Sequence, residues 1–145
     1  MKNRFTSFTM RYWLFSIVLI LTGNIAKAAD YYWKGGSGVW TDLSHWVTSS
    51  GGSTNHAIVP SPLDNVIFDA NSFTAAGQSV TINFQALCNN FTVTSGVGLN
   101  ITFQFNSGLV AAGTISTVQS STITWNQSNL LQAANGVSLS RVNYT

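Results

Sequence analysis

Charged side chains are scarce in this sequence. Its 145 residues include six Lys or Arg and four acidic residues, all of them aspartates. After Asp69 the only charged residue is Arg141. Acid–base catalysis needs positioned groups that can give or take a proton. We therefore expect no catalytic activity of this chain's own and no cofactor.

Cysteine is almost absent as well. Cys88 is the only one, so the chain cannot form an internal disulfide. No neighbouring base or cation is present to turn its thiol into a nucleophile. The sequence predicts a small, buried, inert side chain at this position. Nucleophile-elbow sequences and glycine-rich phosphate loops are also missing.

Residues 1–28 have the pattern of a signal peptide. The basic residues at its start are Lys2, Arg4 and Arg11. The apolar centre, Leu14–Leu21, is much shorter than the roughly 20 apolar residues that span a bilayer. Ala26-Lys27-Ala28 fits the small-x-small pattern of a cleavage site. We expect cleavage after Ala28, a mature chain that starts at Ala29, and no transmembrane segment after cleavage.

Cleavage changes the charge balance. The mature chain keeps two basic and four acidic residues, which gives a net charge of −2. Nucleic-acid binding needs clustered Lys and Arg to neutralise phosphates, so nucleic-acid partners are excluded. Few charges together with many Ser, Thr, Asn and β-branched residues are typical of extracellular all-β proteins. We expect an extracellular or outer-membrane-associated protein, or a periplasmic one if the chain is complete as given.

The mature sequence alternates with a period of two, and no long stretch has the apolar spacing of a helix. The alternating runs are centred near residues 67, 82, 92, 102, 115, 124 and 138, at intervals of roughly ten to thirteen residues. Each run predicts a short, half-buried strand. In the run near residue 82, Val80, Ile82 and Phe84 are expected to share the buried face.

Two all-β architectures fit this rhythm. One is a parallel β-solenoid (β-helix-like), and the other is an antiparallel β-sandwich or jelly roll. Asn and Gly at strand ends and the small residues of 109–115 favour the solenoid. We expect an aromatic N-terminal cap region over 29–75 and a β-strand repeat region over 76–145 with coils of about 20–25 residues. The chain stops at Arg141–Thr145, inside another alternating run that would leave an open sheet edge. We therefore expect the repeat region to be truncated at its C-terminus.

The segment Tyr31–Trp46 holds most of the chemically rich side chains. Trp33, Trp40 and Trp46 lie among three glycines, and Asp42 stands where it would cap a single helical turn. Large aromatic side chains are usually buried, which favours a structural cap on the strand stack. The alternative is a carbohydrate-binding module in which these three tryptophans form an exposed platform for sugar rings.

Metal ligation finds little support in the sequence. The two histidines, His45 and His56, do not have the spacing of a metal motif, and no metal site is predicted. Asp64, Asp69 and Asn71 form an oxygen-rich run of the kind that extracellular Ca²⁺ sites use, but without the order of an EF-hand. Calcium binding by these three residues is left open.

The order of motifs resembles a known group of proteins. Tyr32-Trp33-x-Gly-Gly-x-Gly-x-Trp40, Asp42-x-x-His45-Trp46, the run from Pro60 to Phe73 and Cys88 together resemble the N-terminal segment of large secreted proteins of Bacteroidota. Those proteins often end in gliding-motility-associated or type IX secretion sorting domains. The resemblance implies a β-helical, adhesin-like surface region without known catalysis, exported across both membranes and attached or released at the cell surface. Separately, we expect extracellular glycans or other cell-surface components as partners. No sorting domain is present in this sequence.

Overall fold

The computed structural model describes residues 28–94, 100–118, 123–127, 129–140 and 142–144. All but the last residue of the expected signal peptide lie outside these ranges. Within them the chain is all-β, as predicted, and the only helical turn is the 3-10 turn η1 (Leu43–His45). Asp42 caps that turn, because its carboxylate accepts a hydrogen bond from the Ser44 N–H at 2.9 Å. The predicted capping role of Asp42 is therefore confirmed.

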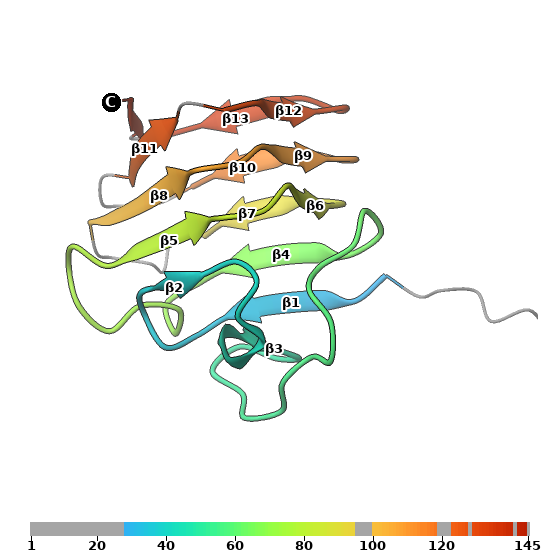
Figure 1. The fold of residues 1–145 in the computed structure, drawn as a ribbon, viewed down its shortest axis with the longest axis vertical. Helices are drawn as coiled ribbons and strands as arrows, with labels where there is room; N and C mark the ends of the chain where they lie inside the picture. The colour runs from blue at the N-terminus through green and yellow to red at the C-terminus, as the bar shows by residue number, and fades with distance from the viewer. Residues whose placement is uncertain (1–27, 95–99, 119–122, 128, 141, 145) are drawn as a thin grey trace, which may run out of the picture.

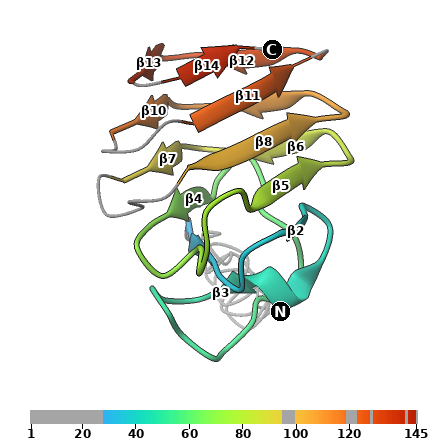
Figure 2. The ribbon, with the colours of Figure 1, turned by 90° about the vertical axis from the view of Figure 1, so that its left-hand side faces the viewer.

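The described strands form three sheets. Sheet A contains β1 (Asp30–Trp33), β3 (Trp46–Val47), β4 (Asn65–Phe68), β7 (Phe91–Val93), β10 (Ile115–Thr117) and β13 (Val137–Leu139). Sheet B contains β2 (Gly38–Val39), β5 (Ser79–Ile82), β8 (Ile101–Phe105), β11 (Ile123–Gln127) and β14 (Val142–Tyr144). Sheet C contains β6 (Ala86–Cys88), β9 (Leu109–Ala111) and β12 (Leu131–Ala133). From β4 onward the chain visits the sheets in the order A, B, C and then returns to A (Figures 1 and 2).

The sheets are parallel, with one antiparallel strand pair at the N-terminal end of sheet A. In that sheet Val66 pairs with Phe91, Phe91 with Ile115 and Ile115 with Val137, so that equivalent positions recur at nearly even steps along the chain. The antiparallel contacts of the described residues are the β1–β3 pair and the Val47–Asn55 bridge. An antiparallel sandwich or jelly roll, the alternative architecture, requires the opposite pairing and does not describe these ladders.

Period-two alternation places one residue in two inside the space between the sheets. Sheet A contributes large rings at this inner face, sheet B contributes Phe103 and Trp125, and sheet C contributes the small side chains of Ala86, Cys88 and Ala111. In sheet C the small side chain of Cys88 lies beside that of Ala111 in register. Stacking of apolar side chains along the ladders gives a continuous core from β1 to β11.

One expected inward residue is exposed. Strand β5 ends at Ile82, and the Phe84 side chain is 61% exposed. The chain turns out of sheet B after Ile82 in order to reach sheet C at Ala86. The period-two pattern therefore ends two residues earlier than the sequence suggests, and Phe84 lies outside the core.

Candidate functional site

The three tryptophans predicted as ligand residues are buried. Trp33 and Trp46 have no exposed surface, and Trp40 is 1% exposed. Stacking of a sugar requires an open ring face, which none of these indoles offers in this arrangement. Their place in the fold agrees instead with the structural reading of the segment, in which large rings pack against the first sheets.

Trp46 stands at the centre of this aromatic group. Its ring makes edge-to-face contacts with Trp33 and Trp40, at centroid distances of 4.9 and 4.8 Å. The Trp46 Nε1–H donates to the Trp40 carbonyl at 2.8 Å, and the Trp33 Nε1–H donates to the Gly36 carbonyl at 2.7 Å. Both buried indole donors are thus satisfied, which removes the main cost of burying a tryptophan.

The aromatic group continues into the rest of the core. Phe68 on β4 packs against Trp33 at 5.7 Å, Phe103 on β8 packs against Phe68 at 4.9 Å, and Trp125 on β11 packs against Phe103 at 5.9 Å. The rings of the first segment and those of the later strands therefore form one connected set. Among the described residues Trp125 Nε1 is a buried donor without a hydrogen-bond partner.

His45 is held as part of the aromatic group. Its ring stacks on Trp33 with a centroid distance of 4.4 Å and an interplanar angle of 3°, and its Nδ1–H donates to the Lys34 carbonyl at 2.6 Å. The Asp42 carboxylate lies 3.8 Å from His45 Nε2. Hydrogen bonds from Ser44, with a small contribution from His45, hold the pKa of Asp42 below its usual value. The Cβ position of Gly38 lies against the His45 ring, so the close approach of backbone and ring requires glycine there.

His56 lies at a separate place. It stacks on Tyr31 at 3.6 Å, and its Nε2 lies 3.1 Å from the Asp30 carbonyl. His45 and His56 thus contact different rings and do not converge. In the described part of the chain no three His, Cys, Asp or Glu side chains are grouped as a metal site would require.

The oxygen-rich run is divided by a strand. Asp64 precedes β4 and Asp69 follows it, so their Cα atoms are about 16 Å apart along an extended backbone. Asp69 Oδ1 accepts from the Asn71 N–H at 2.9 Å, and the Asn71 side chain donates to Ser50 Oγ at 2.8 Å. The structure therefore brings Asp69 and Asn71 together but does not bring Asp64 to them.

Cys88 has the inert character expected from the sequence. It is fully buried on the inner face of β6, and burial raises the pKa of its thiol to about 12. The thiolate that nucleophilic or metal chemistry would need is therefore strongly disfavoured at neutral pH.

A ladder of polar side chains follows one corner of the fold, where the chain enters sheet A. Asn65 Nδ2 donates to Asp30 Oδ1 at 2.9 Å, Asn90 Nδ2 donates to Asn65 Oδ1 at 2.9 Å, and Asn90 Oδ1 accepts from both N–H and Oγ1 of Thr114. Four successive rungs are joined in this way. Sequence reasoning noted Asn at strand ends but missed the ladder, whose signal is the nearly equal spacing of Asn65, Asn90 and Thr114 along the chain.

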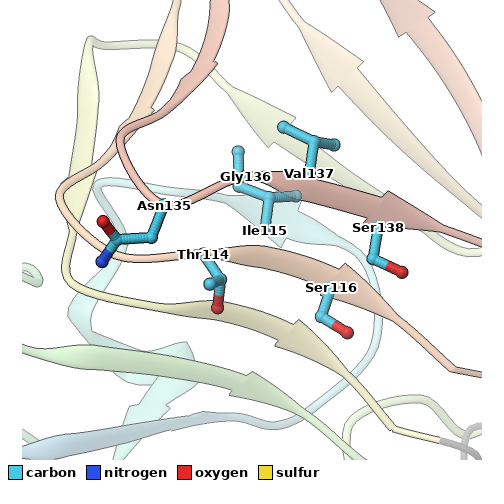
Figure 3. A pocket seen from close by; sticks show the side chains of 7 residues that line it. All are labelled: Thr114, Ile115, Ser116, Asn135, Gly136, Val137 and Ser138. Carbon is cyan, nitrogen blue, oxygen red and sulfur yellow. The ribbon is translucent and has the colours of Figure 1, made fainter.

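A shallow hollow of about 380 Å³ lies along β10 and β13 (Figure 3). Ser116 and Ser138 point to one side of it and Ile115 and Val137 to the other, as alternation requires. The remaining lining residues are Thr114, Asn135 and Gly136. None of the seven side chains titrates near neutral pH, so the hollow offers hydroxyl and amide groups but no acid–base pair.

Comparison of the chain with protein-family models, with curated proteins and with solved structures found no match. Among the described residues no helix has the length and apolar character needed to cross a bilayer.

Proposed function

We propose that this chain is the start of a parallel β-solenoid in a secreted or cell-surface protein, where it has a structural, adhesin-like role. The observation that carries the proposal is the register: in the parallel ladders of sheet A, Val66, Phe91, Ile115 and Val137 lie on successive strands at nearly even steps along the chain. Such stacking builds a rod whose outer faces, and not a pocket, are its largest surfaces.

The outer faces support a contact role. On sheet B, Thr81 pairs with Gln104 and Gln104 with Asn126, all on the side away from the core. On sheet A, Thr92 pairs with Ser116 and Ser116 with Ser138. These rows carry hydroxyl and amide groups without charge, which suits hydrogen bonding to glycans or to other components of a cell surface.

The proposal includes no catalysis by this segment. Each aspartate of the described chain is engaged in a structural hydrogen bond, Asp30 with Asn65, Asp42 with Ser44, Asp64 with Ser61 and Asp69 with Asn71. A binding module that uses Trp33, Trp40 and Trp46 is not supported by their burial. Ligand recognition is therefore assigned to outward polar rows.

The test has two parts. In the source cells, protease treatment of intact cells should degrade the protein, and deletion of its gene should reduce attachment to a surface or to partner cells. Complementation with Gln104→Arg, on the outer face of sheet B, is compared with Ser116→Arg, on the outer face of sheet A. Both strands have a neighbouring strand on each side and both residues face outward, so each variant should keep the circular dichroism of the parent.

Loss of attachment in one of the two variants would identify the contact face. A protein that resists protease in intact cells and is released only by lysis would contradict the surface location. Full attachment in the deletion strain would contradict the adhesin-like role.

A further inference from the structure

Asp64 is a nearly buried carboxylate with an unusual set of partners. It is 7% exposed, and its Oδ2 accepts hydrogen bonds from the Ser61 N–H at 2.9 Å and from Ser61 Oγ at 2.6 Å. Its Oδ1 accepts from the Ala29 N–H at 2.9 Å. Burial acts to raise the pKa of Asp64, but these hydrogen bonds from Ser61 and Ala29 outweigh it, and the pKa is lowered.

A fixed positive partner for Asp64 is missing from the described side chains. Lys34 is the only Lys or Arg among them, and its Nζ donates to the Gly52 carbonyl at 3.1 Å. The hydrogen bonds that Asp64 accepts from backbone N–H groups are already charge-assisted through the carboxylate. A positively charged donor in place of an amide would add a direct Coulomb attraction to the same contact. The position that such a donor would occupy is already taken by a backbone nitrogen, that of Ala29.

Ala29 is the residue that follows the cleavage motif Ala26-Lys27-Ala28. It is held at both ends, because its N–H donates to Asp64 and its carbonyl accepts from the Asn65 N–H at 2.8 Å. Ala28 is exposed and makes no hydrogen bond to the described part of the chain. Cleavage between Ala28 and Ala29 would therefore remove no hydrogen bond of the described fold.

We propose that cleavage after Ala28 creates the missing positive partner: the new α-ammonium of Ala29 forms a partly buried ion pair with Asp64 and fixes the start of sheet A. Hydrolysis of the Ala28–Ala29 peptide bond by a signal peptidase consumes one water and leaves a carboxylate on Ala28. The freed Ala29 amine takes up a proton at neutral pH. The inference rests on the export that the proposed function includes.

The surroundings of this ion pair contain three other titratable groups. Tyr31 lies on β1, and burial together with the Asp64 charge raises the pKa of its phenol, which stays neutral. His56 stacks on Tyr31 and adds positive charge near Asp64 when it is protonated. Asp30 is the residue after Ala29; it is exposed, and its Oδ1 accepts from Asn65 Nδ2. Of these groups only His56 competes for the role of cation.

The experiment exports the full-length precursor in a bacterial host and measures the intact mass of the product, which should start at Ala29. A second precursor carries one extra alanine between Ala28 and Ala29. After the same cleavage its ammonium stands one residue farther from Asp64, and Ala29 again has only an amide N–H. In urea unfolding at pH 7, the unfolding equilibrium constant of this extended form should be about fivefold to tenfold larger than that of the form that starts at Ala29.

The difference between the two forms should depend on Asp64. In an Asp64→Asn background it should disappear, whereas the control Asp69→Asn, whose carboxylate accepts from Asn71, should leave it unchanged. An ion pair raises the pKa of the α-amine above its ordinary value of about 7.7–8.0. The advantage of the Ala29 terminus should therefore be complete just below that range, where Asp64 is ionised, and be lost as the pH rises through the raised pKa of the amine.

A product that starts at another residue would overturn the inference, as would equal stability of the two forms or a difference that survives Asp64→Asn. If Asp64→Asn does not fold, the pH dependence of the two forms with Asp64 present decides alone. Export with a start at Ala29 but without coupling to Asp64 refutes the ion pair and leaves the surface role intact. If the precursor is not exported, the secreted role fails, and the coupling is measured on chains released by a protease site engineered before Ala29.

Discussion

Replacement of Trp40 by alanine tests whether the N-terminal aromatic segment supports the fold or binds a ligand. Trp40 follows β2 directly, and its N–H extends the sheet B ladder by donating to the Thr81 carbonyl at 2.8 Å. Its ring lies 4.8 Å from Trp46 and 6.5 Å from Phe91. Trp40→Ala keeps the backbone contact and removes only the ring.

The expected loss follows from burial. Trp40 is 1% exposed, and truncation of a buried Trp or Phe to Ala costs about 3–5 kcal/mol because of lost transfer energy and the cavity that remains. Single domains of this size unfold with about 5–15 kcal/mol. Trp40→Ala should therefore remove a large fraction of the total stability.

Urea unfolding followed by circular dichroism measures this loss. Val39→Ala is the matched control, since Val39 precedes Trp40 and is 39% exposed, and it should cost less than about 1 kcal/mol. A loss below about 1 kcal/mol for Trp40→Ala, with an unchanged circular dichroism spectrum, would refute the buried-core argument and return the ring to the list of ligand candidates.

Three further predictions concern single side chains. Asn90→Ala removes three ladder hydrogen bonds and should lower the free energy of unfolding in urea by about 2–3 kcal/mol. The control Asn83→Ala loses one exposed hydrogen bond to Thr41 and should cost less than about 0.5 kcal/mol. Equal losses in the two variants would contradict a stabilising role of the ladder. Burial raises the pKa of the Cys88 thiol to about 12, so a thiol reagent at pH 8 should label Cys88 only when the protein unfolds. Mass spectrometry measures the labelling. Labelling of the folded protein at the rate of a free thiol would contradict the burial. Trp46→Phe removes an indole donor that has a hydrogen-bond partner, and Trp125→Phe removes one that has none. Thermal unfolding should therefore show a loss of stability that is about 1–3 kcal/mol larger for Trp46→Phe. The reverse order would contradict the hydrogen-bond argument.

The strands of sheets A and B from β4 to β13 could be predicted from the sequence because period-two alternation survives in them. Strands β1, β2 and β3 lie in the segment expected to be an aromatic cap and were not predicted as strands. The run with Ile101, Phe103 and Phe105 became β8, and the run with Val66 and Phe68 became β4. The short intervals between the alternating runs reflect the passage of the chain from one of these sheets to the other. Two such intervals make one step from a strand of sheet A to the next strand of the same sheet.

Sheet C could not be predicted in the same way. Each of its strands has three residues, and β6 and β9 offer one or two small side chains to the core, such as Ala86 and Cys88. So short a strand gives too few positions for alternation to differ from chance, and Ala or Cys gives little hydropathy contrast. For Phe84 the alternation gave a wrong prediction. This large apolar residue continues the period-two pattern of β5 and was expected to be buried, but β5 ends at Ile82 and the Phe84 side chain is exposed.

The contacts of the candidate site depend on register, which sequence reasoning could not supply. Burial of the three tryptophans followed from their size, and the Asp42 cap followed from its position before a helical turn. The pairing of Asp30 with Asn65 and of Asn65 with Asn90 requires knowledge of which rungs are neighbours. Two asparagines so far apart in the chain can be predicted to be in contact only when the number of residues between successive strands of one sheet is known.

The scarcity of charge and the corner ladder have a common physical basis. A parallel stack places equivalent side chains on neighbouring strands about 4.8 Å apart, so a charged residue at a repeated position would face its own copy and repel it. An asparagine can donate to one neighbour and accept from another, as Asn90 does with Asn65 and Thr114. The same position can therefore recur from rung to rung without an unpaired group. Asp30 stands at the first rung, where its carboxylate needs only to accept, and this is consistent with an acid at the N-terminal end of the ladder and amides beyond it.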